Sequence, residues 1–531
     1  MNRFSDQQLS AVAKREMRVL AAFATTIVST LACAQSSPAV PPSSGDTGPP
    51  IMTWRITPEI TVRESYSDNA ALVPLTEAKK SWVTETTPSL RVEQTGVRTK
   101  FFFDFRLSDF RYTSFSALNN SQRLLTSYAT VEALDNWFFV DASANITQQN
   151  RSAFSIAAAP NLGGPNGNRV ETATNQLSPY IRGRLGGVAT YQLRVVAADI
   201  RSNDIALPDT KGTQWTGFIK NDRATSGLGW SIDGNALSFR NQVVGRSHDA
   251  RIRGSVSYEI GPQIHASAII GREATNFSTS GKNSSNTSGI GLEWSPDIRT
   301  QVAAVKERRF FGDSHSISVS HRTPLSIWKI TSNRDVTALS GQLTASGPGS
   351  TAGLLSDLLA ASIPDPVARE AAVRQRLEDS GISASSASGG GFATGRPFLI
   401  RSDEASVAMR GVLNTITISV TRRDQRGLGP NLGGNDSFSL SNEIRQQGFN
   451  LNWAYRLSPL STFSLVATSL RTEGLSVIAL ESRQRSLNLL FSTRLSPDTF
   501  FTFGARHVQF DNLLNTGYRE NAILASVSFR Y

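Results

Sequence analysis

The sequence lacks most of the chemistry that enzymes and metal sites use. Its 531 residues contain one cysteine, Cys33, and five histidines. Cys33 lies in a segment that we expect to be removed from the mature protein, which excludes disulfides and thiolate sites from the mature chain. The motifs HExxH, Gly-x-Ser-x-Gly and Gly-Lys-Ser/Thr are also missing. The sequence therefore predicts no cofactor, no metal site and no enzymatic activity.

Long apolar runs are absent as well. Only 39% of the residues are hydrophobic, and no run reaches about 18 apolar residues, the length that a helical membrane span needs. Many short segments of moderate hydrophobicity remain. This composition suits either a β-barrel whose strands have one polar face or a large soluble β-protein.

The N-terminus predicts export. Lys14, Arg15 and Arg18 precede an apolar stretch over 19–31, which ends in an Ala-Cys-Ala cleavage site, so we predict a signal peptide over 1–34. The region before Lys14 is long, so Met17 is an alternative start of translation. A lipoprotein with acylated Cys33 is the weaker alternative to the signal peptide. Residues 35–50 are rich in Pro, Ser and Gly and predict a disordered periplasmic lead-in to a barrel over 51–531.

The charge is strongly positive, at +11, and arginine supplies most of it beyond the signal peptide. Guanidinium groups suit phosphate and carboxylate, including the groups of lipopolysaccharide and acidic polysaccharides. A basic pI can also indicate nucleic-acid binding. Export argues against a nucleic-acid partner here.

Apolar and polar residues alternate along many segments. In the last ten residues, Ile523, Val527 and Phe529 alternate with Ser526, Ser528 and Arg530. Side chains alternate across a strand, so each such strand has one apolar and one polar face. A soluble sandwich alternates too, but the number of segments and the terminal aromatic residues favour an all-β transmembrane barrel in the bacterial outer membrane. Val527, Phe529 and Tyr531 resemble the C-terminal signal read by the barrel assembly machinery.

The connections predict the number of strands. Short turn-forming sequences alternate with longer polar stretches, as in outer-membrane barrels with short periplasmic turns and long extracellular loops. Asp233-Gly234-Asn235 is one of the expected turns. The count is about 22 antiparallel strands, within about 20 to 24, and the least certain regions are 203–232 and 323–336.

One connection, 337–397, carries helical patterns. Leu354-Leu355 and Leu358-Leu359 form one apolar stripe, and Asp365-Pro366 is a helix start that is followed by a stop near Gly381. We predict a helical insert in an extracellular loop. It is either a surface ornament or a plug folded into the lumen, since loops of this length are usually functional or disordered.

Several short stretches resemble the PEP-CTERM system-associated outer-membrane barrels, which are encoded with exopolysaccharide and exosortase gene clusters. They are Trp54–Ile60, Glu64–Asn69, Thr86–Leu90, Arg308–Gly312 and Ile363–Pro366. The resemblance implies a role in polymer export or envelope biogenesis. None of the matching residues is implied to be catalytic.

The candidate site residues are arginines in the polar phase of the strands. Rings of cationic side chains bias a pore toward anions and toward acidic polysaccharide. They can equally pair with lumen carboxylates such as Asp104, Asp141 and Glu259 as a wall lattice. The ten arginines expected to face the lumen are Arg106, Arg182, Arg184, Arg194, Arg240, Arg253, Arg456, Arg494, Arg506 and Arg530.

Three functions remain open at this point. The first is a passive pore or conduit associated with exopolysaccharide export. The second is a structural or assembly barrel that does not conduct. The third is a barrel enzyme acting on lipid or glycan, for which the candidates are only five scattered histidines: His248, His265, His315, His321 and His507.

Overall fold

The structure of the protein is a computed structural model that describes most of the chain beyond residue 52. The predicted signal peptide (1–34), the lead-in (35–50) and the predicted helix start at Asp365-Pro366 lie outside the described residues. The described ranges are 53–156, 168–204, 207–221, 227–242, 244–277, 283–337, 351–359, 369, 372–374, 376–377, 391–429, 436–476, 480–513 and 517–531.

The described part contains 22 strands, three short helical elements with defined bounds, and further helical residues at 369, 372–374 and 376–377. None of these helices is long and apolar enough to cross a membrane. The helical elements are η2 (Ser116–Leu118), α3 (Thr351–Leu359) and α5 (Ser437–Leu440). The strands are β1 (Thr53–Ser67), β2 (Ser81–Thr95), β3 (Thr99–Tyr112), β4 (Asn120–Leu134), β5 (Phe138–Asn150), β6 (Arg169–Leu185), β7 (Ala189–Ser202), β8 (Thr210–Asn221), β9 (Leu228–Asn241), β10 (Gly245–Glu259), β11 (Ile264–Thr275), β12 (Asn283–Asp297), β13 (Thr300–Arg309), β14 (Gly312–Arg322), β15 (Ser326–Thr337), β16 (Phe398–Arg410), β17 (Asn414–Gly427), β18 (Glu443–Arg456), β19 (Ser461–Gly474), β20 (Glu481–Ser496), β21 (Thr499–Asn512) and β22 (Tyr518–Arg530).

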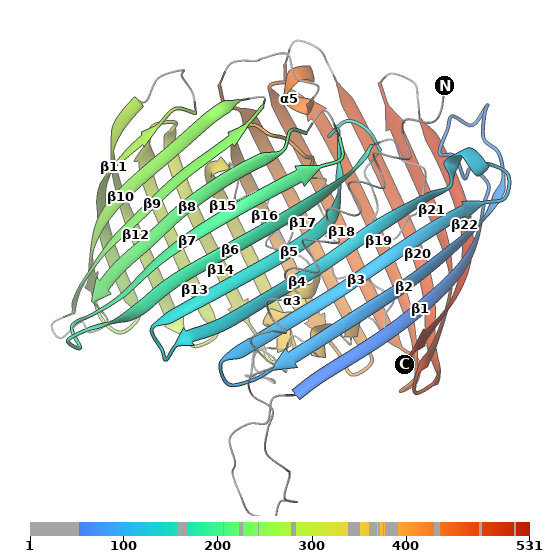
Figure 1. The fold of residues 1–531 in the computed structure, drawn as a ribbon, viewed down its shortest axis with the longest axis horizontal. Helices are drawn as coiled ribbons and strands as arrows, with labels where there is room; N and C mark the ends of the chain where they lie inside the picture. The colour runs from blue at the N-terminus through green and yellow to red at the C-terminus, as the bar shows by residue number, and fades with distance from the viewer. Residues whose placement is uncertain are drawn as a thin grey trace, which may run out of the picture. The chain divides into compact units, whose positions relative to one another are not determined.

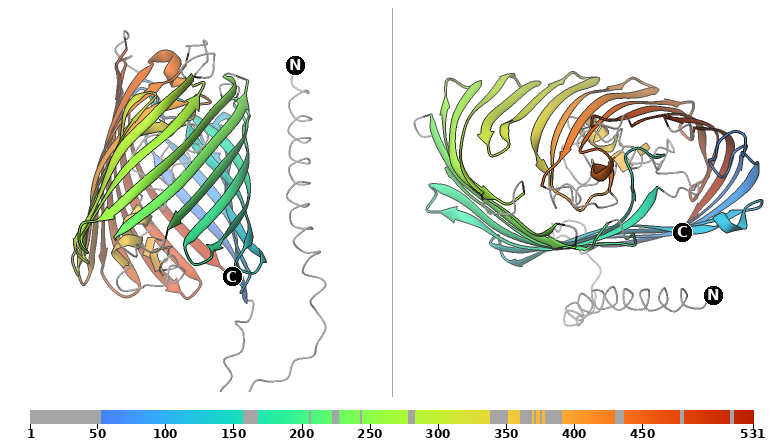
Figure 2. Two further views of the ribbon diagram at one scale, coloured as in Figure 1. Left: turned by 90° about the vertical axis from the view of Figure 1, so that its left-hand side faces the viewer. Right: turned by 90° about the horizontal axis from the view of Figure 1, so that it is seen from above.

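The strands form one closed antiparallel sheet (Figure 1, Figure 2). Each strand pairs with its neighbours in sequence, and β1 pairs with β22 to close the barrel. Closure leaves no unpaired edge, which is the condition for a sheet to cross a membrane. The fold class and the number of strands predicted from the sequence are confirmed.

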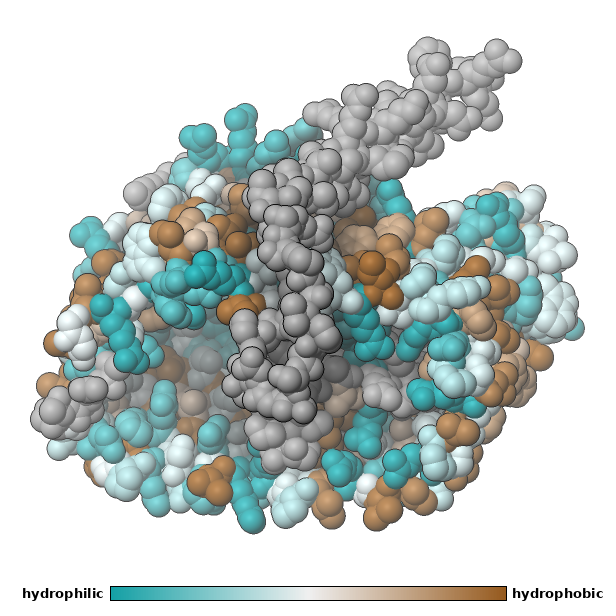
Figure 3. Space-filling view, turned by 60° about the horizontal axis from the view of Figure 1, so that its bottom comes forward, coloured by the Kyte–Doolittle hydropathy of each residue, from teal (hydrophilic) through white to brown (hydrophobic). Residues whose placement is uncertain are grey.

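The two faces of the wall are sorted as the alternation predicts. Across the β1–β22 pair, Ile60 lies opposite Phe529 and Val62 opposite Val527, and all four point outward and are exposed. The intervening positions point inward, where Arg530 pairs with Glu59 at 3.0 Å. Seen obliquely from below, the barrel has prominent apolar residues at its outer margin (Figure 3). An apolar outward face is what lipid chains require.

The connections define two ends of the barrel. The turn end carries short connections such as 96–98 and 186–188, and both Thr53 and Arg530 lie there. The loop end carries the longer connections, including 68–80 and 338–397. One predicted turn is wrong, since Asp233-Gly234-Asn235 lies inside β9. The connection between β8 and β9 is at 222–227 instead and ends at Gly227, whose φ is +74°.

The inside of the loop end has the reverse pattern of the wall. Several inward residues there are apolar and buried, among them Phe239, Phe277, Phe110 and Phe510. Phe239 and Phe277 form a cluster with Ile200, and loop residue Leu428 packs against it. The loops that fold over the mouth supply the apolar partners that a water-filled lumen does not. Near the loop end, an apolar residue in the alternating pattern can therefore point inward instead of outward.

The seam between the first and last strands is latched at the loop end. Asp68 accepts two hydrogen bonds at 2.7 Å from the backbone and side-chain amides of Asn521. Asn69 is 1% exposed and donates to the carbonyls of Val73, at 2.7 Å, and Arg519, at 3.0 Å. These two residues belong to the Glu64–Asn69 stretch. They join the first loop to the last strand.

Asn69→Ala should weaken this latch. The change removes both donors from two partly buried carbonyls, so we expect a loss of about 1–2 kcal/mol of stability. Guanidinium unfolding in detergent would measure the loss. Asn120→Ala is the control because the Asn120 side chain donates to the carbonyl of nearby Leu118. Equal unfolding midpoints for the two variants would contradict the latch.

Candidate binding cavity inside the lumen

The described helical part of the insert between β15 and β16 lies inside the barrel. Its two ends meet at the loop end, where Thr337 pairs with Phe398, but α3 packs against Ile327 and Ala408 at the turn end. Residues 369, 372–374 and 376–377 are helical as well. The views from the side and from above agree in placing α3 in the space that the strands enclose (Figure 2). The connection starts from the loop end as predicted, and its helical part lies in the lumen rather than on the surface.

Apolar packing holds the helical part of the insert. Leu354, Leu355, Leu358 and Leu359 are buried and share one face of α3. They pack against the wall and against Val373 and Leu377 of the second helical stretch, which supply the other half of a small core. The predicted leucine stripe is thus explained by burial inside the barrel. Val466 of β19 packs against the edge of this core.

Ion pairs tie the insert to two separate parts of the wall. Asp357 of α3 accepts a hydrogen bond from Lys329 of β15 at 3.2 Å. Arg374 forms an ion pair with Glu93 of β2 and lies over the ring of Phe102 of β3, 4.8 Å from its centroid. Strands β2 and β3 are far from β15 along the sheet. The insert therefore bridges the lumen.

The returning part of the insert is fixed at the loop end by a buried ion pair. Arg396 lies 3.3 Å from Asp436, and their side chains are 4% and 6% exposed. Asp436 also caps α5 by accepting from the Ser439 amide, and it accepts from the Thr394 hydroxyl at 2.9 Å. Asn241 of β9 donates to the Gly395 carbonyl at 2.7 Å. The insert is thus anchored at both ends of the barrel.

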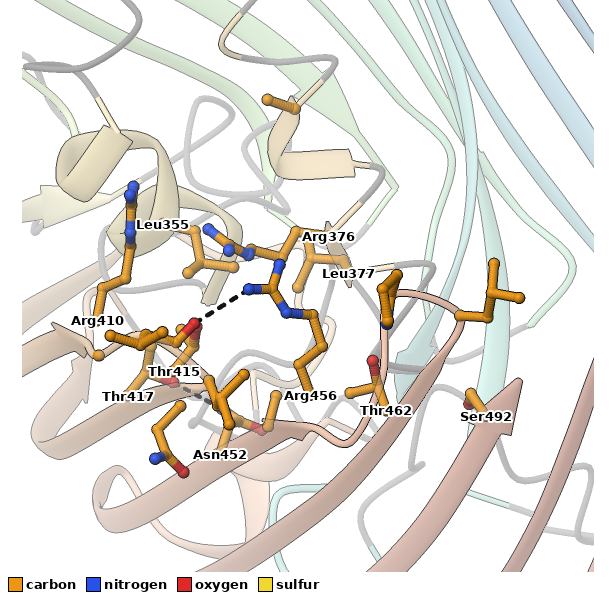
Figure 4. Close-up of a pocket in the computed structure, with 18 of the residues that line it drawn as sticks. Leu355, Arg376, Leu377, Arg410, Thr415, Thr417, Asn452, Arg456, Thr462 and Ser492 are labelled. Atoms are coloured by element: carbon orange, nitrogen blue, oxygen red, sulfur yellow. Dashed lines mark hydrogen bonds between the residues drawn. The ribbon is translucent and has the colours of Figure 1, made fainter. Parts of the chain in front are cut away.

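A cavity of about 530 Å³ lies between the insert and the wall at the turn end. The residues that line it include Leu355 and Arg376 of the insert, Arg410 and Arg456 of the wall, and Arg494. Figure 4 shows the side chains of Arg376 and Arg456 reaching into the same space. Arg456 donates to the Val412 carbonyl at 3.1 Å.

The lining is cationic and partly polar. Among the described residues that line the cavity there are four arginines and no aspartate or glutamate. Thr415, Thr417, Thr462 and Ser492 add hydroxyl groups, and Leu355 and Phe500 add apolar surface. Guanidinium forks beside hydroxyls can bind carboxylate or phosphate, and the apolar surface can contact a sugar ring.

Nine of the ten predicted arginines point inward. Strand register places Arg106, Arg182, Arg184, Arg194, Arg253, Arg456, Arg494, Arg506 and Arg530 in the inward phase. Five of them bind carboxylates of the wall. The partners are Asp104 for Arg106, Asp141 for Arg194, Asp233 and Glu307 for Arg253, Glu520 for Arg506 and Glu59 for Arg530.

The predicted arginines that pair with carboxylates of the wall are therefore not the ones that line the cavity. Arg182 lies over the ring of Phe139, and only Arg456 and Arg494 of the predicted set reach the cavity. Arg376 and Arg410 also line it and were not predicted. Arg410 ends β16 next to a short turn, and Arg376 lies in a helix, so strand alternation did not single out either residue.

Arg240 is the exception, and its predicted direction is wrong. It lies opposite Lys211 in the same phase as Ile232 and Trp215, which are exposed on the outside. Its neighbour Phe239 takes the inward position and is buried. The apolar residues face inward at this height because the loops cover them, so the polar residue of the pair faces outward.

The C-terminal residues and the histidines also have clear positions. Val527, Phe529 and Tyr531 are exposed, Val527 and Phe529 in the outward phase of the seam, and Phe529 and Tyr531 form an edge-to-face pair at 4.7 Å. Their role as an assembly signal stays a prediction. Of the five histidines, His265 points inward, and His248, His315, His321 and His507 point outward.

Comparison with known proteins yields only structural likenesses. No protein-family model and no curated protein matches the sequence. Among solved structures, the chain is similar to the FrpB iron transporter (F3-3 variant) from Neisseria meningitidis, with 9% identity, a TM-score of 0.47, and 89% of this chain and 81% of that chain covered. The siderophore receptor PirA from Pseudomonas aeruginosa gives 9% identity and a TM-score of 0.40, with 90% and 80% covered. OccK2 (OpdF) from Pseudomonas aeruginosa in complex with glucuronate gives 9% and 0.34, with 90% and 98% covered.

Proposed function

We propose that this protein is an outer-membrane conduit for anionic solutes, narrowed by its own insert. The observation that carries the proposal is the closed 22-stranded barrel whose lumen holds the insert beside the cationic cavity. Barrels of this strand number are wide and are commonly plugged. The turn end would face the periplasm and the loop end the outside, as in bacterial barrels.

The solute class follows from the cavity. A carboxylate or phosphate passing the turn end meets Arg410, Arg456 and Arg376 with threonine hydroxyls around them. Acidic sugars carry carboxylates on rings that can pack against Leu355 or Phe500. An acidic exopolysaccharide is the solute that we propose on this basis, because the arginines suit acidic groups and the sequence resemblance implies polymer export. Export of such a polymer needs no catalytic group.

Planar-bilayer conductance tests the conduit. Purified protein should give single channels, and oligomers of an acidic polysaccharide such as alginate should block them, whereas neutral dextran of equal length should not. A protein that stays silent even without the insert would instead be a non-conducting structural barrel. The observation that favours this alternative is that the insert bridges the lumen by ion pairs to two parts of the wall.

Removing cavity charges should change ion selectivity. Arg410→Gln with Arg456→Gln takes two cationic groups from the cavity at the turn end of the lumen, so we expect the anion-to-cation permeability ratio to fall roughly threefold or more. The reversal potential in a salt gradient measures this ratio. The control is Arg410→Lys with Arg456→Lys, which keeps both charges and should keep the selectivity. Equal ratios for the Gln and Lys variants would contradict the assignment of this cavity.

A further inference from the structure

Three cationic residues form a row across neighbouring strands on the outer wall. Lys211 of β8 lies directly opposite Arg240 of β9, and Arg240 lies directly opposite Arg246 of β10. All three side chains are exposed. They share the outward phase with Trp215 and Ile252 of the same strands, which are 50% and 59% exposed. We call these three residues the cationic row.

No carboxylate of the described residues forms an ion pair with the cationic row. Like charges directly opposite one another destabilise a sheet. Within the described part of the chain, none of these three side chains forms a hydrogen bond or an ion pair. Asp199 of β7 lies opposite Lys211 in the register, but its carboxylate binds Arg201 at 2.8 Å. The row therefore holds uncompensated positive charge on three adjacent strands.

A group of outward arginines on another part of the loop end is compensated, unlike the row. On β16 to β18, Arg401 binds Asp403 at 3.0 Å, and Asp424 accepts from both Arg422, at 3.1 Å, and Arg445, at 2.7 Å. These residues lie at comparable positions near the loop ends of their strands. The same outer surface thus contains a self-neutralised patch and an open cationic one.

The height of the row on the wall indicates its ligand. Lys211 precedes Trp215 by four residues, which is about 13 Å along the strand. Trp215 and Ile252 belong to the outward apolar face, so the row lies just beyond that face toward the loop end. In an outer membrane, this is the level at which the phosphate groups of the outer leaflet meet a barrel.

We propose that the cationic row binds the lipid A phosphate groups of lipopolysaccharide. Arginine forks bind phosphate oxygens in pairs, and lysine adds a point charge, so Arg240 and Arg246 would orient the phosphate while Lys211 strengthens the attraction. The acyl chains would then lie along the apolar wall beside Trp215. The assignment rests on the outer-membrane location proposed above and is independent of what the lumen carries.

Binding of purified lipopolysaccharide to the full-length protein in detergent tests this assignment. The row variant is Lys211→Gln with Arg240→Gln and Arg246→Gln. The matched control, Arg401→Gln with Arg422→Gln and Arg445→Gln, removes equal charge from the compensated patch. We expect the row variant to bind phosphorylated lipopolysaccharide roughly tenfold or more weakly, and the control to change by less than about threefold. Wild-type protein should also prefer phosphorylated over enzymatically dephosphorylated lipopolysaccharide.

Other outcomes would overturn the assignment. Equal losses for the two variants, or no preference for phosphorylated lipid, would make the attraction nonspecific. Displacement of lipopolysaccharide by millimolar inorganic phosphate would reassign the row to a soluble phosphate. Resistance to heat unfolding on gels checks that each variant is folded. Because the row faces away from the lumen, its variant should keep wild-type conductance, which separates failure of this inference from failure of the conduit.

Discussion

Removal of the insert should convert a narrow conduit into a wide pore. Replacing residues 345–390 with a short Gly/Ser linker deletes α3 and the second helical stretch, and the wall stays closed because Thr337 and Phe398 are already paired neighbours. A 22-stranded barrel without its plug is wider than a porin of 16–18 strands, so we expect single-channel conductance to rise roughly fivefold or more. Planar-bilayer recording measures this directly.

A second variant tests whether the insert must be held in place, and not only be present, to restrict conductance. Asp357→Asn with Arg374→Gln keeps the insert at full length but removes its ion pairs to Lys329 and Glu93. We expect this variant to fluctuate between the wild-type conductance and a higher level, because only apolar packing then holds the helices. Wild-type conductance after deletion of 345–390 would show that the insert restricts nothing. Silence before and after the deletion would favour the structural barrel.

The alternation of apolar and polar residues along the strands is enough to predict most of the fold. The outward phase of β22, with Val527 and Phe529, is apolar because lipid gives no hydrogen bonds, and the inward phase is polar because the lumen holds water. That single rule predicts whether each strand residue points outward or inward. The loops between the alternating segments predict the number of strands. Closure between β1 and β22 follows from the even count.

The errors have one physical origin, which is tertiary context. Asp233-Gly234-Asn235 has strong turn propensity, yet Asp233 stays in a strand, where it binds Arg253 at 3.0 Å, while the chain turns nearer Gly227. The prediction that Arg240 points inward assumes that polar phases face the lumen, which holds in the middle of the wall. Near the loop end, Phe239 is covered by loops, so the rule reverses.

The candidate cavity was only half visible in the sequence. Arg456 and Arg494 followed from the strand phase, but Arg410 and Arg376 did not. Their meeting depends on where the insert docks. Its contacts on the wall, Ile327 and Ala408, are single apolar residues whose neighbours in the inward phase are mostly polar. No local pattern distinguishes such a docking site from an ordinary variation in the wall.

The buried ion pair that holds the returning insert gives the largest expected loss of stability. Asp436→Ala removes the carboxylate that pairs with Arg396 and leaves a guanidinium whose side chain is 4% exposed. Breaking a buried pair from one side costs about 3–5 kcal/mol. The same change deletes the α5 cap and the acceptor for Thr394, and loss of a cap alone costs about 1 kcal/mol.

Guanidinium unfolding in detergent, followed by tryptophan fluorescence, would measure the loss. The matched control is Asp109→Asn, whose partner Arg111 is 61% exposed and whose ion pair should contribute about 0–1 kcal/mol. A loss for Asp436→Ala no larger than for the control would mean that Arg396 finds water or another partner, and that the anchor is weak. A large loss together with noisier single channels would instead link the anchor to the insert, because Arg396 belongs to the same connection between β15 and β16 as the helices in the lumen. Stability would then measure the anchor of the insert at the loop end, and conductance would measure the position of its helices at the turn end.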